Sequence, residues 1–144
     1  MEHRIWGEEC RTTLMCVDCY DHGVLAGRLY HACRKEGWFF RSLMEFLKQM
    51  EELLDEVKCP QPFAERRLFE RSGKVAAQTA PDEEPKTGHL ATFSVRVMFR
   101  QNASWQGSLT WLEKGSEQSF RSVLELIMLI HSVLGREADH KKDA

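Results

Sequence analysis

The clearest pattern of hydrophobic and polar positions lies in the second half of the chain, where two stretches alternate with a period of two. Residues 93–99 and 105–111 each place large apolar side chains on one side and mostly polar side chains on the other. This alternation is typical of half-buried β-strands. Residues 101–104 between them supply turn chemistry, so the pattern predicts a hairpin. A more degenerate hairpin is predicted in the first half, from residues 13–20 and 24–32.

Each hairpin is followed by a helical pattern that begins with the same string, Phe-Arg-Ser-x-x-Glu. Ser42 with Glu45, and Ser122 with Glu125, have the spacing of a capping box, in which serine and glutamate satisfy free backbone amides at a helix start. Apolar residues then recur at helical spacing along one face. They are Leu43, Leu47, Met50, Leu54 and Val57 in the first helix, and Val123, Ile127, Ile130 and Leu134 in the second.

Capping does not account for the arginine in this string. Arg41 and Arg121 each lie just before a helix start, where a cation opposes the helix macrodipole. Each arginine is therefore expected to have a partner, which is either the nearby Glu45 or Glu125, or a bound anion.

The two hairpin-helix patterns match each other at a fixed offset of eighty residues with no insertion; identical pairs include Thr12/Thr92, Gly27/Gly107, Phe40/Phe120, Arg41/Arg121, Ser42/Ser122 and Leu54/Leu134. Such an offset indicates a duplicated unit. The predicted fold is therefore α+β, a tandem ββα repeat in which a four-stranded antiparallel sheet carries two helices on one face. A permuted ferredoxin-like arrangement with pseudo-twofold symmetry is one form of this fold. A looser pairing of two ββα units is the alternative.

Glycine stands in the middle of both second strands, at Gly27 and Gly107. Glycine weakens a strand interior and packs nothing, so its presence there marks a close approach to the backbone. We expect that a helix or a bulky side chain such as Phe40 or Phe120 makes this approach. A ligand lying against bare backbone is the alternative.

The chain of 144 residues suits a single domain over residues 1–144, long enough to bury a core. The stretch between the two copies is polar and punctuated by proline and glycine, which favours a linker. We expect copy one at 12–58, a linker at 59–89 with a packed segment at 63–69, copy two at 90–135 and a flexible tail at 136–144.

The composition, with 42% hydrophobic and 29% charged residues, is ordinary for a globular protein. A net charge of -2 gives no bulk attraction to nucleic acid or to an anionic membrane. The longest apolar run, residues 126–130, is too short to span a bilayer, and the first ten residues lack the pattern of a signal peptide. We therefore expect a cytoplasmic protein with no cofactor, in which the five cysteines are free thiols.

The two predicted helices differ on their outer sides. The first has Lys48, Glu51 and Glu52 there, whereas the second has Met128, Leu129, His131 and Ser132 at corresponding places. A helix that is apolar nearly all round in a small domain is either deeply buried or covered by a partner. We interpret these residues as an interface, most simply with a second copy across a twofold axis. The alternative is that the linker covers them.

The outward face of the predicted sheet suggests a second function. It carries Cys16, Asp18, Tyr20, Arg28 and Tyr30 in copy one, and Arg96, Met98, Arg100, Gln106, Ser108 and Thr110 in copy two. Arginines and tyrosines on an open sheet are typical of single-stranded nucleic-acid platforms. The negative net charge and the absence of an RNP-like string favour an ordinary solvated face instead.

Metal binding and catalysis have weaker signals. Cys16, Cys19 and His22 have ligand types suited to zinc, but residues three apart on an extended strand point to opposite faces. His31 aligns with the core-facing Trp111, which predicts a packed histidine. The sequence has no Gly-rich phosphate loop, no His-Glu-x-x-His and no Gly-x-Ser-x-Gly, so we do not expect an enzyme.

The stretch 97–134 contains the strings Phe-Arg-Gln-Asn-Ala-Ser-Trp-Gln-Gly and Phe-Arg-Ser-Val-Leu-Glu-Leu. In these strings it resembles a family of short uncharacterised bacterial proteins, which implies a bacterial origin and carries over no activity. The resemblance draws attention to the hairpin 99–111, whose polar side chains exceed what a turn requires. We place a candidate binding site there, near the second helix start; its residues are Arg100, Gln101, Asn102, Gln106 and Arg121. The leading hypothesis is a non-enzymatic binding or regulatory module that forms a homodimer or binds another protein.

Overall fold

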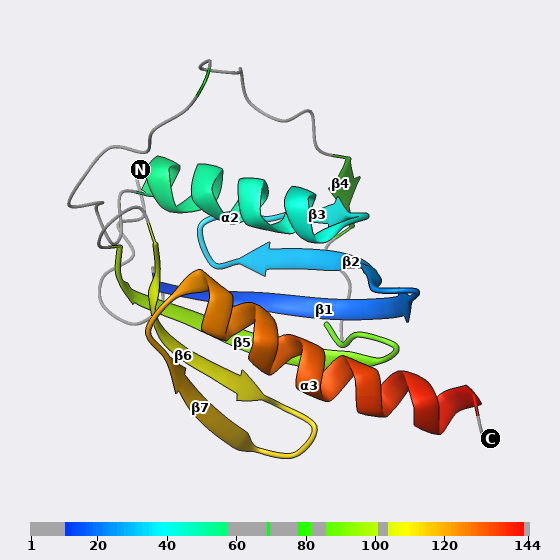
Figure 1. Ribbon diagram of the computed structural model, residues 1–144. Helices are drawn as coiled ribbons and strands as arrows, with labels where there is room; N and C mark the ends of the chain where they lie inside the picture. The colour runs from blue at the N-terminus through cyan, green and yellow to red at the C-terminus, as the bar shows by residue number, and fades with distance from the viewer. Residues whose placement is uncertain (1–10, 58–68, 70–77, 82–85, 101–103, 143–144) are drawn as a thin grey trace.

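A computed structural model describes the chain except for residues 1–10, 58–68, 70–77, 82–85, 101–103 and 143–144. The described residues form one antiparallel sheet of seven strands and two helices (Figure 1). The strands are β1 (Thr12–Asp21), β2 (Val24–His31), β3 (Gly37–Phe40), β4 (Thr79–Ala80), β5 (Ala91–Phe99), β6 (Gln106–Trp111) and β7 (Ser116–Phe120). The helices are α2 (Leu43–Val57) and α3 (Val123–Lys142). The strand order across the sheet is β4-β3-β2-β1-β5-β6-β7.

The α+β class is therefore right, but the prediction of a four-stranded sheet built from ββα units is wrong. Each half contains a third strand, β3 or β7, between its hairpin and its helix. The ferredoxin-like arrangement also fails, because β1 and β5 form the central pair and the glycine-bearing β2 and β6 flank them. The third strands escaped prediction because neither alternates. β3 is a short apolar run, and β7 is a polar edge strand of which only Phe120 is buried.

The two halves have the same order of elements, three strands and then a helix, and their strands pair in matching register. We call β1–β3 with α2 the N-terminal half, and β5–β7 with α3 the C-terminal half. In the central ladder Thr13 lies opposite Val95 and Met15 lies opposite Phe93. These two pairs are equivalent, because Phe93 is the counterpart of Thr13 and Met15 is the counterpart of Val95 at the offset of eighty residues. Internal duplication would produce this match, and it stays a prediction.

Both halves also share a bulge opposite the mid-strand glycine; the bulges lie between Val17 and Cys19 and between Val97 and Phe99. A Cβ atom on Gly27 would overlap the carbonyl oxygen of Cys16, and one on Gly107 would overlap that of Arg96. Phe40 is also close to Gly27, with its Cζ 3.0 Å from the Cβ position. The close approach therefore comes mainly from the backbone of the adjacent strand, because the bulge brings the two strands together.

The predicted capping boxes form at both helix starts. Ser42 Oγ accepts a hydrogen bond from Glu45 N, and Ser122 Oγ accepts one from Glu125 N, each at 3.1 Å. The glutamate carboxylates reach back one residue further than expected, to the backbone amides that precede the serines. Capping therefore fixes where α2 and α3 begin. α3 continues to Lys142, through much of the stretch predicted as a tail.

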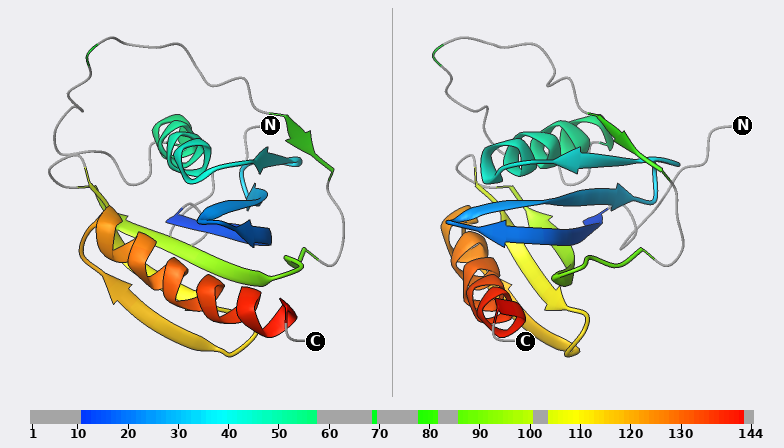
Figure 2. Two further views of the ribbon diagram at one scale, coloured as in Figure 1. Left: turned by 45° about the vertical axis from the view of Figure 1, so that its right-hand side comes forward. Right: turned by 90° about the vertical axis from the view of Figure 1, so that its right-hand side faces the viewer.

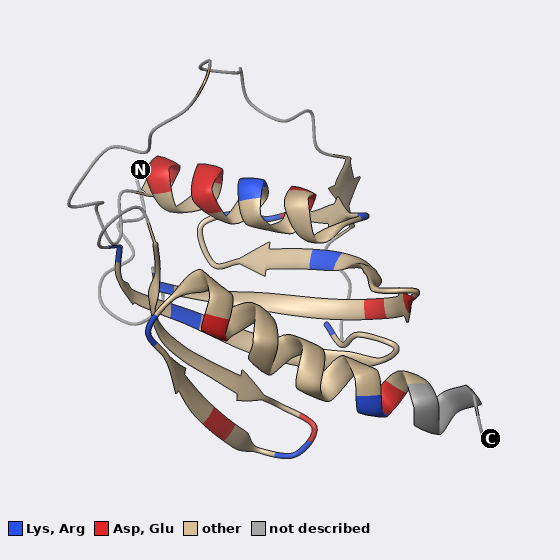
Figure 3. Ribbon diagram, viewed as in Figure 1, with Lys and Arg blue, Asp and Glu red and all other residues tan. Residues whose placement is uncertain are grey.

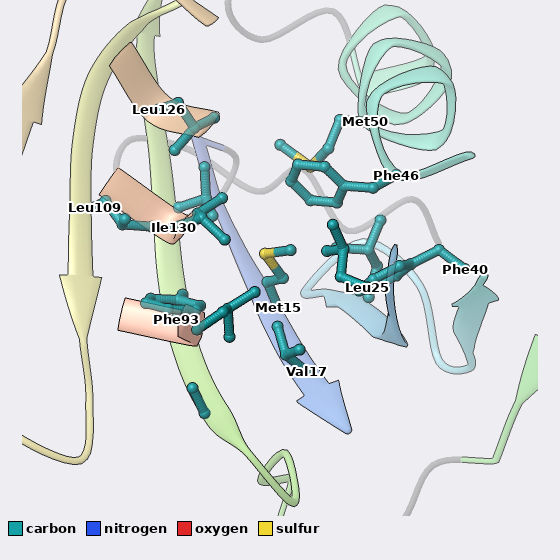
Figure 4. Close-up of a cluster of buried hydrophobic side chains, with 14 of the residues drawn as sticks. Met15, Val17, Leu25, Phe40, Phe46, Met50, Phe93, Leu109, Leu126 and Ile130 are labelled. Atoms are coloured by element: carbon teal, nitrogen blue, oxygen red, sulfur yellow. The ribbon is translucent and has the colours of Figure 1, made fainter. Parts of the chain in front are cut away.

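Both helices pack on the same face of the twisted sheet (Figure 2). Phe46 and Met50 of α2 and Leu126 and Ile130 of α3 approach a shared core around Met15 of the central strand (Figure 4). All of these side chains are buried. Burial of this apolar face, rather than helix propensity, holds the helices on the sheet.

The segment between the halves contributes to the sheet. Gln78 O accepts a hydrogen bond from Phe39 N at 2.9 Å, and β4 pairs with the outer edge of β3. Further along, Leu90 N donates to Val17 O of β1. The predicted packed segment 63–69 lies outside the described residues except for Phe69, which is exposed. No helix in the described part of the chain is long and apolar enough to cross a membrane.

Candidate functional site

The outer side of α3 is the largest difference between the two helices. Leu124 and Met128 are 68% and 57% exposed, on the side away from the buried Leu126 and Ile130. Between Glu125 and Arg136 the helix has no charged residue, whereas α2 carries charges along its length (Figure 3). We call Leu124, Met128, His131 and Ser132 the α3 patch.

The predicted interface residues take different places. Met128 projects outward, but Leu129 is only partly exposed and packs against the core. His131 is exposed and its Nδ1 lies 2.7 Å from the hydroxyl of Tyr20 on β1. Ser132 Oγ donates to Leu129 O within its own helix at 2.6 Å. The outward surface therefore includes Met128, His131 and Ser132.

Leu124 was not predicted as an interface residue, although it is more exposed than Met128. Its equivalent in α2 is Met44, which is also apolar and 66% exposed. Because both helices have an apolar residue at this position, the difference between their outer sides does not point to Leu124. The apolar pair Leu124 and Met128, four residues apart on one helical face, was the available signal.

Two residues predicted on the outward sheet face, Tyr20 and Arg100, lie on the helix side instead. Each follows the bulge of its strand, and the extra residue of a bulge moves every later side chain to the opposite face. Tyr20 therefore reaches α3 at His131. Arg100 reaches α2, where its Nη1 donates to Asp55 Oδ1 at 2.7 Å.

Arg100 is a structural contact between the halves. It is only 2% exposed, its Nη1 is also 3.7 Å from Glu51 Oε2, and its Nη2 donates to Leu54 O. Glu51 also accepts from the indole Nε1 of the buried Trp105. Its guanidinium is therefore held among carboxylates of α2, and its role as a ligand residue stays a prediction.

Of the remaining candidate ligand residues, the structure describes only two. Gln101 and Asn102 lie outside the described residues. Gln106 is half-buried on the face opposite the helices, paired with Phe99. Arg121 is exposed at the start of α3 and its Nε is 3.0 Å from Glu125 Oε1.

The Arg121–Glu125 pair identifies the partner of the arginine that precedes the second helix start. The hydrogen bond from Arg121 lowers the pKa of Glu125 and raises the pKa of Arg121. Glu125 is thus the partner that the sequence required. At Arg41 the backbone amide makes the equivalent contact to Glu45.

The sheet face away from the helices is occupied in the N-terminal half. Residues 86–90, which we call the strap, cross β1 and β2 there. Arg28 forms a bidentate ion pair with Asp18 at 2.9 and 3.0 Å and donates to Thr87 O of the strap at 2.7 Å. The hydrogen bond to Asp18 raises the pKa of Arg28. Beside it, Tyr30 is buried and Lys86 Nζ lies 5.3 Å from its ring centre.

The contacts made by Arg28 and Tyr30 on this sheet face leave less of it open for nucleic acid. Tyr20 and Arg100 are on the other face, and Tyr30 and Arg28 contact residues of the segment that links the halves. Stacking of bases needs exposed aromatic rings. Among the aromatic side chains predicted for this face, none is therefore available in the described structure. Nucleic-acid binding itself stays a prediction.

The cysteine and histidine candidates for a metal do not form a site. The bulge brings Cys16 and Cys19 to the same face, contrary to expectation, but Cys16 is buried and Cys19 is exposed. Burial raises the pKa of the Cys16 thiol to about 11, which keeps it protonated. His22 lies in the turn beside Asp21, with 3.0 Å between Nδ1 and Oδ1. No cluster that could hold a metal ion occurs among the described residues.

His31 is packed, as its alignment with Trp111 suggested. It is buried, and its Nδ1 accepts a hydrogen bond from Cys33 N at 3.0 Å. Its neighbour across the β1–β2 ladder is Thr13, which is also buried. His31 thus packs at the end of β2 and holds the turn that follows it.

No protein-family model, curated protein sequence or solved structure matches this chain. The resemblance of residues 97–134 to short bacterial proteins stays a prediction. The function must therefore be argued from the geometry of the chain itself. In that geometry the α3 patch is a feature that the fold does not explain.

Proposed function

We propose that this protein is a cytoplasmic, non-enzymatic binding module that acts through protein–protein contacts, and that a second copy of the chain is its partner. The observation that carries the proposal is the exposure of Leu124 and Met128 on a helix that has no charged residue between Glu125 and Arg136. Exposed apolar side chains that cluster on one element, rather than scatter singly, are typical of interaction surfaces.

The comparison with α2 supports a selected surface rather than chance exposure. The position equivalent to Met128 is Lys48, and the positions equivalent to His131 and Ser132 are Glu51 and Glu52. α2 therefore has the charged outer side that a solvated helix needs, and α3 has uncharged residues at the same places.

A second copy is the simplest partner. Two copies of α3 can meet antiparallel across a twofold axis, with the same residues on both sides of the contact. Because the patch itself carries no ionised aspartate, glutamate, lysine or arginine, this meeting brings no like charges of the patch together. Apolar contact in the centre with polar residues around it is the usual form of such an interface.

The proposal is tested by the mass of the protein in solution. We expect Met128→Lys to weaken the dimer at least about tenfold, or about 1.4 kcal/mol, when measured by sedimentation velocity over a range of concentrations. The substitution only gives α3 the residue that α2 has at Lys48, so the fold should tolerate it. Leu124→Lys should act in the same direction.

Met44→Lys is the matched control, because Met44 is the exposed equivalent of Leu124 on the other helix. It should leave the dimer unchanged. A wild-type protein that is monomeric at all concentrations, or equal effects of Met44→Lys and Leu124→Lys, would contradict the proposal.

A further inference from the structure

The two ends of the sheet differ in whether their edges are covered. At one end, β4 pairs with the outer edge of β3. At the other end β7 is the last strand, and no described strand pairs with its outer edge. Residues 116–119 are exposed. Since β3 and β7 hold equivalent places in the two halves, the described residues give the sheet one covered edge and one bare edge of the same kind.

The backbone groups at the bare edge can be identified. Leu112 N donates to Thr92 O of β5, so alternation along β6 directs the backbone of Leu109 toward β7. Leu109 lies opposite Gln118. The backbone groups of Gln118 therefore face β6, and those of its neighbours Glu117 and Ser119 point out to the free edge.

The covered edge shows what such groups bind. Phe39 is the residue equivalent to Ser119, and its amide donates to Gln78 O at 2.9 Å. The N-terminal half thus satisfies this amide with a strand from its own chain. In the described structure the C-terminal half has no corresponding strand, although the backbone geometry is the same.

The bare edge has little of the usual protection of edge strands; its one charged side chain is Glu117. Natural edges are blunted by short length, charged side chains, especially lysine, proline or a bulge. The β4 end is two residues long and is followed by Pro81. β7 pairs with β6 over five successive residues with no register shift, and it contains neither lysine nor proline.

We propose that the β7 strands of two copies pair antiparallel about a twofold axis at Gln118, joining the two sheets into one. In this register Glu117 lies opposite Ser119 of the second copy, and both present outward backbone groups. Gln118 lies opposite its own equivalent, where two amides can hydrogen-bond. No glutamate faces a glutamate, so the pairing brings no like charges directly together.

The second copy fits this edge better than an open series of strands would. Each molecule has one bare edge, and a twofold pairing uses both at once. The short β4 end offers little to extend the sheet further. The assembly therefore closes as a dimer. The same pairing lays both α3 helices, which contact β7, on one face of the joined sheet; in this respect the inference rests on the proposed self-association and gives it a geometry.

The first test is Ser119→Pro, with Ser119→Ala as the matched control. Proline removes the outward amide without removing a group that bonds to β6. We expect sedimentation velocity to show at least a tenfold weaker dimer for the proline variant and an unchanged dimer for the alanine variant. A proline variant with wild-type dimer affinity would overturn the inference.

A second test does not depend on the proline variant folding. Gln118→Cys should form a disulfide-linked dimer on mild oxidation, because the twofold axis places the two side chains side by side. Ser116→Cys is the control, since in this register it lies opposite Phe120 of the second copy and far from its own equivalent. Equal cross-linking at both positions, or none above the parent protein at either, would overturn the register.

The α3 variants separate this inference from the proposed function. A dimer that is lost with Met128→Lys but kept with Ser119→Pro would support the α3 patch and overturn β7 pairing. The reverse result would support β7 pairing and overturn the α3 contact. Loss with both variants supports one interface that includes both surfaces.

Discussion

The N-terminal and C-terminal halves share a backbone plan but differ in how completely they cover it. In the N-terminal half β4 covers the outer edge of β3, the strap crosses the sheet face, and α2 has a charged outer side. In the C-terminal half the described residues leave the edge of β7 unpaired, and α3 has no charged residue between Glu125 and Arg136. The sheet edge and the outer side of the helix are thus covered or charged in the N-terminal half and are open to a partner in the C-terminal half.

This difference suggests where selection acts on the molecule. The shared features, which are the bulges, the mid-strand glycines and the capped helix starts, are those that the fold needs in both halves. The features found in only one half are not required by the backbone plan that the two halves share. They are therefore the better candidates for function.

The largest expected effect tests what the halves share. Gly27→Ala and Gly107→Ala should each lower the free energy of unfolding by about 3 kcal/mol, because the added Cβ would overlap the carbonyl oxygen of a neighbouring strand. Urea unfolding measures both variants. If only one substitution lowered the stability, the two halves would not share the same close contact between strands, and their equivalence would be contradicted.

The contacts between halves should differ in strength. Arg100→Met removes a buried guanidinium from Asp55 and Glu51, which should cost about 2–3 kcal/mol, less than a fully buried pair because Asp55 is partly exposed. Tyr20→Phe removes the hydroxyl that meets the exposed His131, which should cost about 0.5–1 kcal/mol. The same urea series measures both, and equal losses would show that the buried contact does not dominate.

An effect confined to high pH concerns the buried thiol at the strap side of the sheet. Burial raises the pKa of Cys16 to about 11 from 9.0, so its contribution to stability is complete below pH 9 and is lost as the pH rises toward 11. Cys16→Ala should therefore show a smaller loss of stability than the parent between pH 9 and 11.

Alkylation of the native protein at pH 8 gives an independent reading of the same thiol. The exposed Cys19 should react with iodoacetamide readily, and Cys16 should react only on unfolding, as peptide mass spectrometry would show. Rapid modification of Cys16 would mean that the sheet beneath the strap is accessible.

The sequence predicted the elements that carry periodic signals. Both hairpins and both helix starts lie where alternation and the Ser-x-x-Glu spacing placed them. It did not predict β7, because a polar edge strand such as Ser116–Phe120 buries almost nothing and so has no alternation. β4 is only two residues long and depends on its pairing with β3.

The faces of Arg100 and Tyr20 could not be predicted, for a different reason. A period-two pattern continued through the bulge assigns both side chains to the wrong face of the sheet. The alternation of apolar and polar residues before a bulge does not predict that the bulge follows. The mid-strand glycines opposite both bulges were the available signal, since glycine inside a strand often marks such a site.

Amide hydrogen exchange of Ser119 and Phe39, followed by NMR at several protein concentrations, tests the central claim most directly. The account predicts that the Phe39 amide is protected at every concentration, because Gln78 O accepts its hydrogen bond within the chain. The Ser119 amide should exchange fast in dilute protein and become protected as dimers form. Fast exchange at Ser119 under conditions where the protein sediments as a dimer would contradict the claim that the open edge of the C-terminal half is where two copies meet.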